Sequence, residues 1–136
     1  MTRYTFGFSR DIAIPFPDAV SATAAALQAE GFHVTQLGEP EAYANGKAAQ
    51  PAYAILDACD PALLKHSIST RPDLSLMTTC RAVICSNGTG ATLCISDPYQ
   101  TLGKSAQTPS LAGIVQELNG RLWSAYLRVV LAAAEL

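Results

Sequence analysis

"SLMTTCRAVICSNGTGATLCIS", residues 75–96, decides the fold. Two runs that alternate in hydropathy flank Asn87-Gly88, a pair typical of tight hairpin turns. A two-residue turn there would place Ile84 opposite Ala91, and a four-residue loop would shift the partners without changing the side that each residue faces. One face of this hairpin is wholly apolar and consists of Cys80, Ala82, Ile84, Ala91, Leu93 and Ile95. The other face is small and polar, so the hairpin needs a hydrophobic layer on one side only.

The rest of the chain supplies more strands and the helices that could form this layer. Alternating or apolar runs predict strands at 4–14, 32–37 and 52–58. Helices are predicted between Pro17 and Gly31, from Asp60-Pro61 to about Ser69, and from Thr108-Pro109 onward. The last helix is expected to have Trp123 and Tyr126 on its flank and an apolar stripe at helical spacing, which consists of Leu111, Val115, Leu118, Leu122, Ala125 and Val129. Residues 38–51 contain few large apolar groups, so we expect a long connection with room for one helical turn at 41–45.

These elements define an α+β fold in the order β-α-β-β-α-β-β-α. We expect one domain over 1–136, a two-layer sandwich with the helices on one face of a mixed or antiparallel sheet. The opposite face collects small and polar residues, which suits a dimer contact or a ligand. Its predicted members are Thr5, Gly7, Ser9, His33, Thr35, Thr79, Arg81, Val83, Thr92 and Cys94.

Composition excludes several classes of protein. Hydrophobic residues make up 49% of the chain and charged residues 15%, which is too apolar for a disordered chain. The nine basic residues form no cluster, so we expect no nucleic-acid partner. No apolar run reaches the length of a signal peptide or of a membrane span, so we expect a cytoplasmic protein without a membrane partner.

Four cysteines are the main candidates for chemistry. Their spacing contains no C-x-x-C, so neither a zinc knuckle nor a thioredoxin-type pair is indicated. Cys80 is expected to point into the core, and Cys85 and Cys94 away from it. In the two-residue register Cys85 and Cys94 would be roughly 13 Å apart along the strands, too far for a disulfide.

Cys59 ends a strand directly before Asp60, which is expected to cap the following helix. Ligands of α/β sheets often bind at such a strand end, and a helix N-terminus favours a thiolate. Cys59 is therefore either a working thiol or a small buried hydrophobe. His33 on the polar face could ligate a metal or haem iron, although a lone strand histidine is more often an ordinary surface residue.

Several segments carry a family resemblance: "GF" at 31–32, "ACDPALLKHSI" at 58–68, "LMTTCRAVI" at 76–84 and "SDP" at 96–98. In this order they resemble domain-of-unknown-function family 302, over nearly the whole chain. The resemblance implies a compact α/β sandwich, a homodimer, and no established activity. Asp60 stands where that family usually has Asn, and Thr79 where it has Pro before the second motif cysteine.

Three functions remain open, and no catalytic motif of the G-x-S-x-G, Walker or Rossmann type favours an enzyme. The first is a homodimeric module that binds a small ligand, metal or haem near the motif cysteines. Its expected ligand-binding residues are Cys59, Asp60, Cys80, His33 and Arg81, and Cys59, Cys80 and His33 are the metal candidates. The second is a thiol-redox protein in which Cys59 attacks and Cys80 resolves. The third is a purely structural interaction domain.

Overall fold

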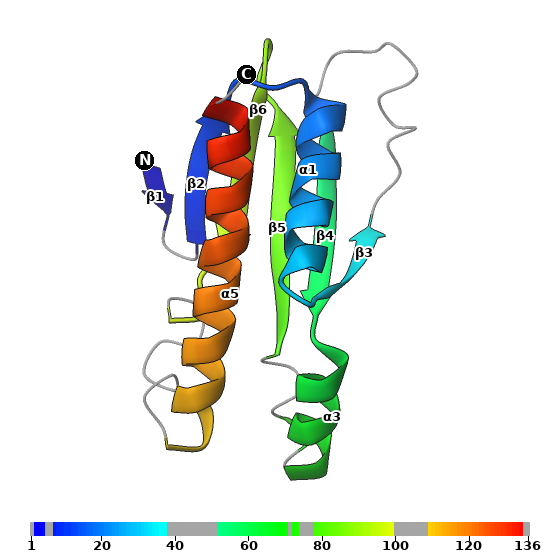
Figure 1. Ribbon diagram of the computed structural model, residues 1–136, viewed down its shortest axis with the longest axis vertical. Coiled ribbons are helices and arrows are strands. Elements are labelled where there is room, and N and C mark those ends of the chain that lie inside the picture. The colour runs from blue at the N-terminus through cyan, green and yellow to red at the C-terminus, as the bar shows by residue number, and fades with distance from the viewer. Residues whose placement is uncertain are drawn as a thin grey trace.

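The computed structural model describes residues 2–4, 7–37, 52–70, 72–73, 78–99 and 109–134. Its strands form one antiparallel sheet in the spatial order β1-β2-β6-β5-β4-β3 (Figure 1). The strands are β1 (Thr2–Tyr4), β2 (Gly7–Ile12), β3 (His33–Leu37), β4 (Tyr53–Cys59), β5 (Thr79–Ser86) and β6 (Ala91–Ser96). The expected connection at 38–51, with its helical turn at 41–45, lies outside the described residues.

Two helices form the second layer. Helices α1 (Phe16–Ala29) and α5 (Pro109–Ala134) lie side by side over one face of the sheet, whereas α3 (Pro61–Thr70) lies beyond the ends of β4 and β5 (Figure 1). The predicted α+β two-layer sandwich with one open sheet face is therefore confirmed. We call the sheet surface opposite α1 and α5 the open face. No helix in the described part of the chain is long and apolar enough to cross a bilayer.

The core lies between the sheet and the two covering helices. Strand alternation supplies its sheet side, because Leu56 and Ala58 of β4 and Ile84 of β5 are almost fully buried. The predicted stripe of α5 supplies much of the helix side, with Val115, Leu118, Leu122, Ala125 and Val129 all buried. The side chain of Leu111, the remaining member of that stripe, lies outside the described residues.

Tyr126 differs from its expected place on the flank of α5. The side chain is 2% exposed, and its ring stacks on Trp123 with the centroids 5.2 Å apart. Phe8 of β2 closes this aromatic cluster, since its ring lies 4.7 Å from Trp123 and 6.3 Å from Tyr126. Aromatic contacts of this kind join the N-terminal part of the sheet to the last helix.

The hairpin of β5 and β6 has the predicted faces but a longer loop. Ser86 pairs with Ala91, so Asn87 to Gly90 form a four-residue loop, and Ile84 lies opposite Leu93. Asn87 stabilises this loop because its Oδ1 accepts a hydrogen bond from the Gly90 N–H at 3.2 Å. Each residue keeps its expected side, because a shift of two positions preserves the alternation.

The longer loop corrects the separation expected for Cys85 and Cys94. Cys85 lies opposite Thr92, so Cys94 is its diagonal neighbour at a typical Cα distance of roughly 7–8 Å. The value of 13 Å was wrong because it assumed the shorter turn. Both cysteines are nevertheless free thiols.

The first predicted strand is divided in two. Residues 4–14 were expected to form one strand, but β1 turns back on β2, with Tyr4 paired to Gly7. At Gly7 a side-chain carbon would collide with the backbone carbonyl of Ile95, so only glycine allows this close approach to β6. Ile12 and Ile14, at the end of the predicted segment, are buried.

Candidate functional site

Asp60 organises the junction between β4 and α3. Its Oδ1 accepts hydrogen bonds from the backbone N–H groups of Ala62 at 2.9 Å and Leu63 at 3.4 Å. This is the expected N-cap geometry, and it occupies N–H groups at the start of the helix that could otherwise stabilise a neighbouring thiolate.

Arg121 of α5 connects this junction to the rest of the fold. Its Nη1 lies 2.7 Å from the second carboxylate oxygen of Asp60, and its Nε donates to the Glu30 carbonyl at 2.9 Å. Both side chains of the ion pair are mostly shielded, at 17% and 21% exposed. The hydrogen bond from Arg121 is the main reason that the pKa of Asp60 is lowered, so Asp60 is a carboxylate in the folded protein.

The Gly31-Phe32 segment completes the same cluster. The Arg121 guanidinium lies 4.3 Å from the centroid of the Phe32 ring, a cation–π contact. Gly31 has a φ of +90°, and an added Cβ there would lie 2.9 Å from Arg121 Nη2. Glycine is therefore required both by the backbone and by the guanidinium. Two of the family-like segments, "GF" and "CDP", meet at one arginine.

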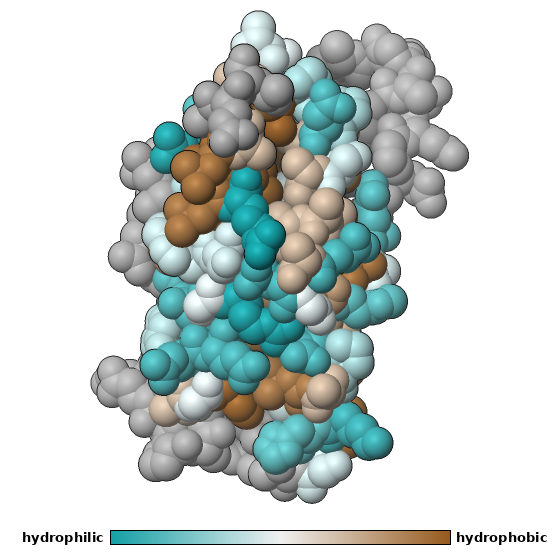
Figure 2. Space-filling view, viewed as in Figure 1, coloured by the Kyte–Doolittle hydropathy of each residue, from teal (hydrophilic) through white to brown (hydrophobic). Residues whose placement is uncertain are grey.

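Further polar contacts continue along the helix pair. Glu30 Oε2 accepts hydrogen bonds from Ser124 at 3.2 Å and from Arg128 Nε at 3.0 Å. Figure 2 shows the result as a stripe of hydrophilic residues along the line between α1 and α5. These contacts connect the C-terminal end of α1 to α5, and the polar groups that form them are hydrogen-bonded within the chain.

The two motif cysteines lie on neighbouring strands but on opposite faces of the sheet. Cys80 is paired with Ala58, and both are buried in the core. Cys59 is paired with Thr79 and half-buried, on the open face. Burial raises the pKa of Cys80 to about 12, so this thiol stays protonated at neutral pH.

His33 lies beside Cys59 as its direct partner across the β3–β4 pair. Its side chain is exposed and shares the open face with Cys59, because the adjacent Val34 packs against the core. Within the described ranges no three His, Cys, Asp or Glu side chains gather as a metal site. The structure brings His33 and Cys59 together and leaves Cys80 on the other side of the sheet.

Arg81 follows Thr79 by two residues on β5, so its side chain also projects from the open face. Its Nε and Nη2 bind the two carboxylate oxygens of Asp57 at 2.7 and 3.2 Å, across the β4–β5 pair. This contact raises the pKa of Arg81. Among the sequence-predicted ligand-binding residues, Arg81 is thus the one held by a forked ion pair.

The open face has two halves. One half, the polar end, lies toward α3 and consists of His33, Thr35, Asp57, Cys59, Thr79 and Arg81. The other half, the apolar band, crosses β3 to β6 and consists of Leu37, Tyr53, Ile55, Val83, Cys85 and Cys94. Leu37 and Tyr53 are 37% and 41% exposed. A band of this kind is unusual for a sheet surface that only faces water.

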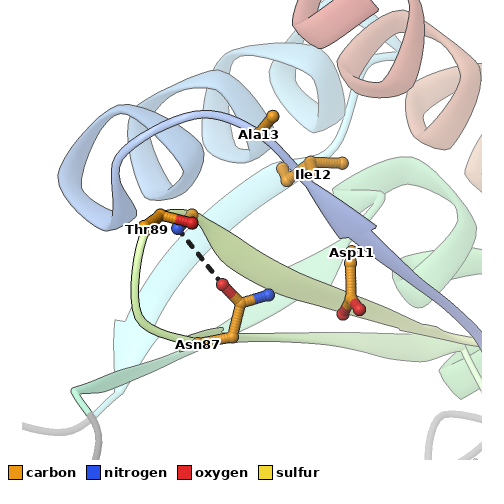
Figure 3. A pocket seen from close by; sticks show the side chains of 6 residues that line it. Asp11, Ile12, Ala13, Asn87 and Thr89 are labelled. Atoms are coloured by element: carbon orange, nitrogen blue, oxygen red, sulfur yellow. Dashed lines mark hydrogen bonds between the residues drawn. The ribbon is translucent and has the colours of Figure 1, made fainter.

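A shallow hollow lies at the opposite end of the sheet from Asp60, around the β5–β6 loop (Figure 3). Asp11, Ile12, Ala13, Asn87, Thr89 and Gly90 line it. Asp11 accepts a hydrogen bond from the Thr92 hydroxyl at 2.7 Å, and that hydroxyl accepts one from Asn87 Nδ2 at 3.1 Å. The lining groups therefore support the loop through contacts with one another.

The fold and this junction define a class: small α+β sandwiches in which the described helices cover only one face of the sheet and a cap holds the strand-to-helix corner. The model of the family "Domain of unknown function DUF302" matches residues 8–129, and the chain belongs to this family. The chain is also similar to the crystal structure of an uncharacterized conserved protein DUF302 from Bacillus stearothermophilus. That similarity has a TM-score of 0.74 and 19% identity, and covers 93% of this chain and 99% of the other. No curated protein matches the chain.

Sequence reasoning missed Arg121 as the residue on which the motifs converge. One signal was present, since Arg121 falls on the buried side of α5 between Leu118 and Leu122, where a charged residue needs a partner. The identity of that partner required the fold, because Asp60 is distant in sequence.

Proposed function

We propose that this chain is a non-catalytic binding module that works as a homodimer, with two copies meeting through their open faces. The apolar band is the observation that carries the proposal. Hydrophobic side chains on a bare sheet face are stabilised when a second sheet covers them, at a typical spacing of ~10 Å. The polar end would then lie beside the interface as the ligand-facing surface.

A second copy is the occupant that this face fits best. The five strands β2 to β6 have five to eight residues each and make a surface of roughly 25 by 20 Å, the same order as the ~800 Å² that each partner contributes to a standard interface. On this face, Asp57 forms an ion pair with Arg81 within the chain, so these two opposite charges compensate each other. Charged residues make up only 15% of the chain, and the buried centres of protein interfaces are depleted of charged residues, so this composition is compatible with a second copy covering the face.

Thiol-redox chemistry gains less support from the geometry. A resolving thiol must reach the attacking sulfur, but Cys80 points into the core while Cys59 points to the open face. The Asp60 carboxylate also accepts hydrogen bonds from the N–H groups at the start of α3, so these groups are not available to stabilise a thiolate.

Light scattering and sedimentation at micromolar concentration test the proposal. We expect the wild-type chain to be a dimer, and Val83→Glu, which places a charge in the apolar band, to weaken the dimer at least tenfold. Leu37→Lys, at an exposed position on edge strand β3, is the second variant because it disturbs the fold less. Leu131→Glu, on α5 and 61% exposed, is the matched control and should stay dimeric.

Two results would overturn the proposal. One is a wild-type chain that is monomeric at tens of micromolar. The other is a dimer that survives Leu37→Lys and Val83→Glu but dissociates in Leu131→Glu, because the interface would then lie on the helix face.

A further inference from the structure

The pair of His33 and Cys59 offers two metal donors on accessible surface. The two residues are direct cross-strand partners, whose Cβ atoms are typically ~4.5–5.5 Å apart. Both side chains project from the open face, and no side-chain hydrogen bond within the described residues joins either of them to a carboxylate. An imidazole ring and a thiol are thus neighbours on this face.

Other donors close to this pair are already engaged. The Asp57 carboxylate is held by Arg81, and the Asp60 carboxylate is held by Arg121 and the α3 N-terminus. Cys80 is buried on the core side of the sheet. Since no third His, Cys, Asp or Glu joins them in the part of the chain that the structure describes, a metal held here would have two protein ligands.

We infer that His33 and Cys59 bind one soft monovalent cation, Cu(I), through one imidazole nitrogen and one thiolate sulfur. Cu(I) accepts two-coordinate geometry, and thiolate and imidazole are ligands that suit copper. A thiolate and Cu(I) also sum to zero charge, which fits a surface of low charge. Hard cations such as Mg²⁺ need several oxygen ligands, whereas the nearby carboxylates of Asp57 and Asp60 are engaged by arginines.

The binding step is a ligand exchange without oxidation or reduction. The Cys59 thiol loses its proton to solvent, the sulfur and the His33 nitrogen form bonds to Cu(I), and copper releases the chelator that delivered it. The inference rests on the proposed binding role of the open face, and it names the class of ligand.

Anaerobic competition between the full-length chain and a chromogenic Cu(I) chelator tests the inference. We expect one Cu(I) per wild-type chain, and at least a tenfold loss of affinity in Cys59→Ser and in His33→Ala. Cys85→Ser and Cys94→Ser are matched controls, because these thiols lie on the same face and form the competing diagonal pair. His66→Ala, on the exposed side of α3, is the histidine control. X-ray absorption at the copper edge should show one nitrogen and one sulfur ligand.

Equal affinity in Cys59→Ser or His33→Ala would overturn the inference, as would loss of binding in Cys85→Ser or a wild-type chain that takes no copper from the chelator. Light scattering on the same samples distinguishes a failure of the copper inference from a failure of the proposed dimer. A dimer that binds no Cu(I) contradicts only the metal inference. A monomeric wild-type chain that binds one Cu(I) through His33 and Cys59 contradicts only the dimer.

Discussion

Replacing Asp60 tests whether the corner between β4 and α3 is held by charge as well as by a helix cap. Asp60→Ala removes both contributions, whereas Asp60→Asn keeps an acceptor for the α3 N–H groups and removes only the charge. Loss of an N-cap costs ~1 kcal/mol of the free energy of unfolding. The ion pair is four-fifths shielded from solvent, so we assign it about 1–2 kcal/mol, between an exposed pair and a charged buried hydrogen bond.

The expected losses at pH 7 are therefore about 2–3 kcal/mol for Asp60→Ala and about 1–2 kcal/mol for Asp60→Asn. Urea unfolding followed by circular dichroism measures both. Glu117→Gln is the matched control, because Glu117 Oε1 lies 3.8 Å from the same Arg121 nitrogen and its side chain is 58% exposed. Its loss should stay below about 0.5 kcal/mol.

The dependence on pH has a definite sign. Folding lowers the pKa of Asp60 below its ordinary value of 3.8, chiefly through the Arg121 hydrogen bond. The stability from the charge is thus fully present above the unfolded pKa and is lost as pH falls through the lower folded value. The difference between wild type and Asp60→Asn should be constant from about pH 5 to 8 and shrink at and below about pH 3. A difference unchanged by acid, or a Glu117→Gln loss as large as that of Asp60→Asn, would refute the reasoning.

Three further outcomes follow from the described contacts. Gly31→Ala should lower the free energy of unfolding by about 1–2 kcal/mol, because the backbone at this position has a left-handed φ and the added Cβ would lie against Arg121 Nη2. In urea unfolding it should lower stability more than the control Gly88→Ala, whose added Cβ would have no atom within 4 Å. Cys80 should resist iodoacetamide in the native protein at pH 8, since it is buried with a pKa of about 12; peptide mass spectrometry that finds it labelled as fast as in urea would contradict this. Arg81→Met should cost less than about 1 kcal/mol in thermal unfolding, because the Arg81 side chain is 55% exposed, and a larger loss would mean that the forked pair with Asp57 supports the sheet.

Local periodicity predicted the features that depend on neighbouring residues. Alternation in 75–96 identified which hairpin residues face the core, because side-chain direction survives any even shift of register. Asp60-Pro61 marked the start of α3, because a cap and a first-turn proline act on the backbone next to them. The burial of the α5 stripe followed from its helical spacing in the same way.

Features that depend on the three-dimensional meeting of distant segments were beyond such reasoning. The four-residue loop makes Cys85 and Cys94 diagonal neighbours on adjacent strands. The residues of the loop do not by themselves predict its length. The pairing of β2 with β6 depends on the close approach of Gly7 to the backbone of Ile95. The cluster of Gly31, Phe32, Asp60 and Arg121 joins α1, β4 and α5, so its members have no common local pattern. The side chains of Cys59 and Cys80 project from opposite faces of the sheet, and this relation depends on the register between β4 and β5.

The order of strands in the sheet has a consequence for biosynthesis. β2 is made early and pairs with β1 on one side, yet its neighbour on the other side is β6, with Ile12 paired to Ala91. In the same way, α1 shares the helix layer with α5, which is made much later. The sheet cannot be completed until β6 has left the ribosome, and the helix layer cannot be completed until α5 has followed. Non-local pairings of this kind slow folding. Truncation before Pro109 would remove α5, one of the two helices that cover the apolar side of the sheet, and would leave that part of the core exposed to water.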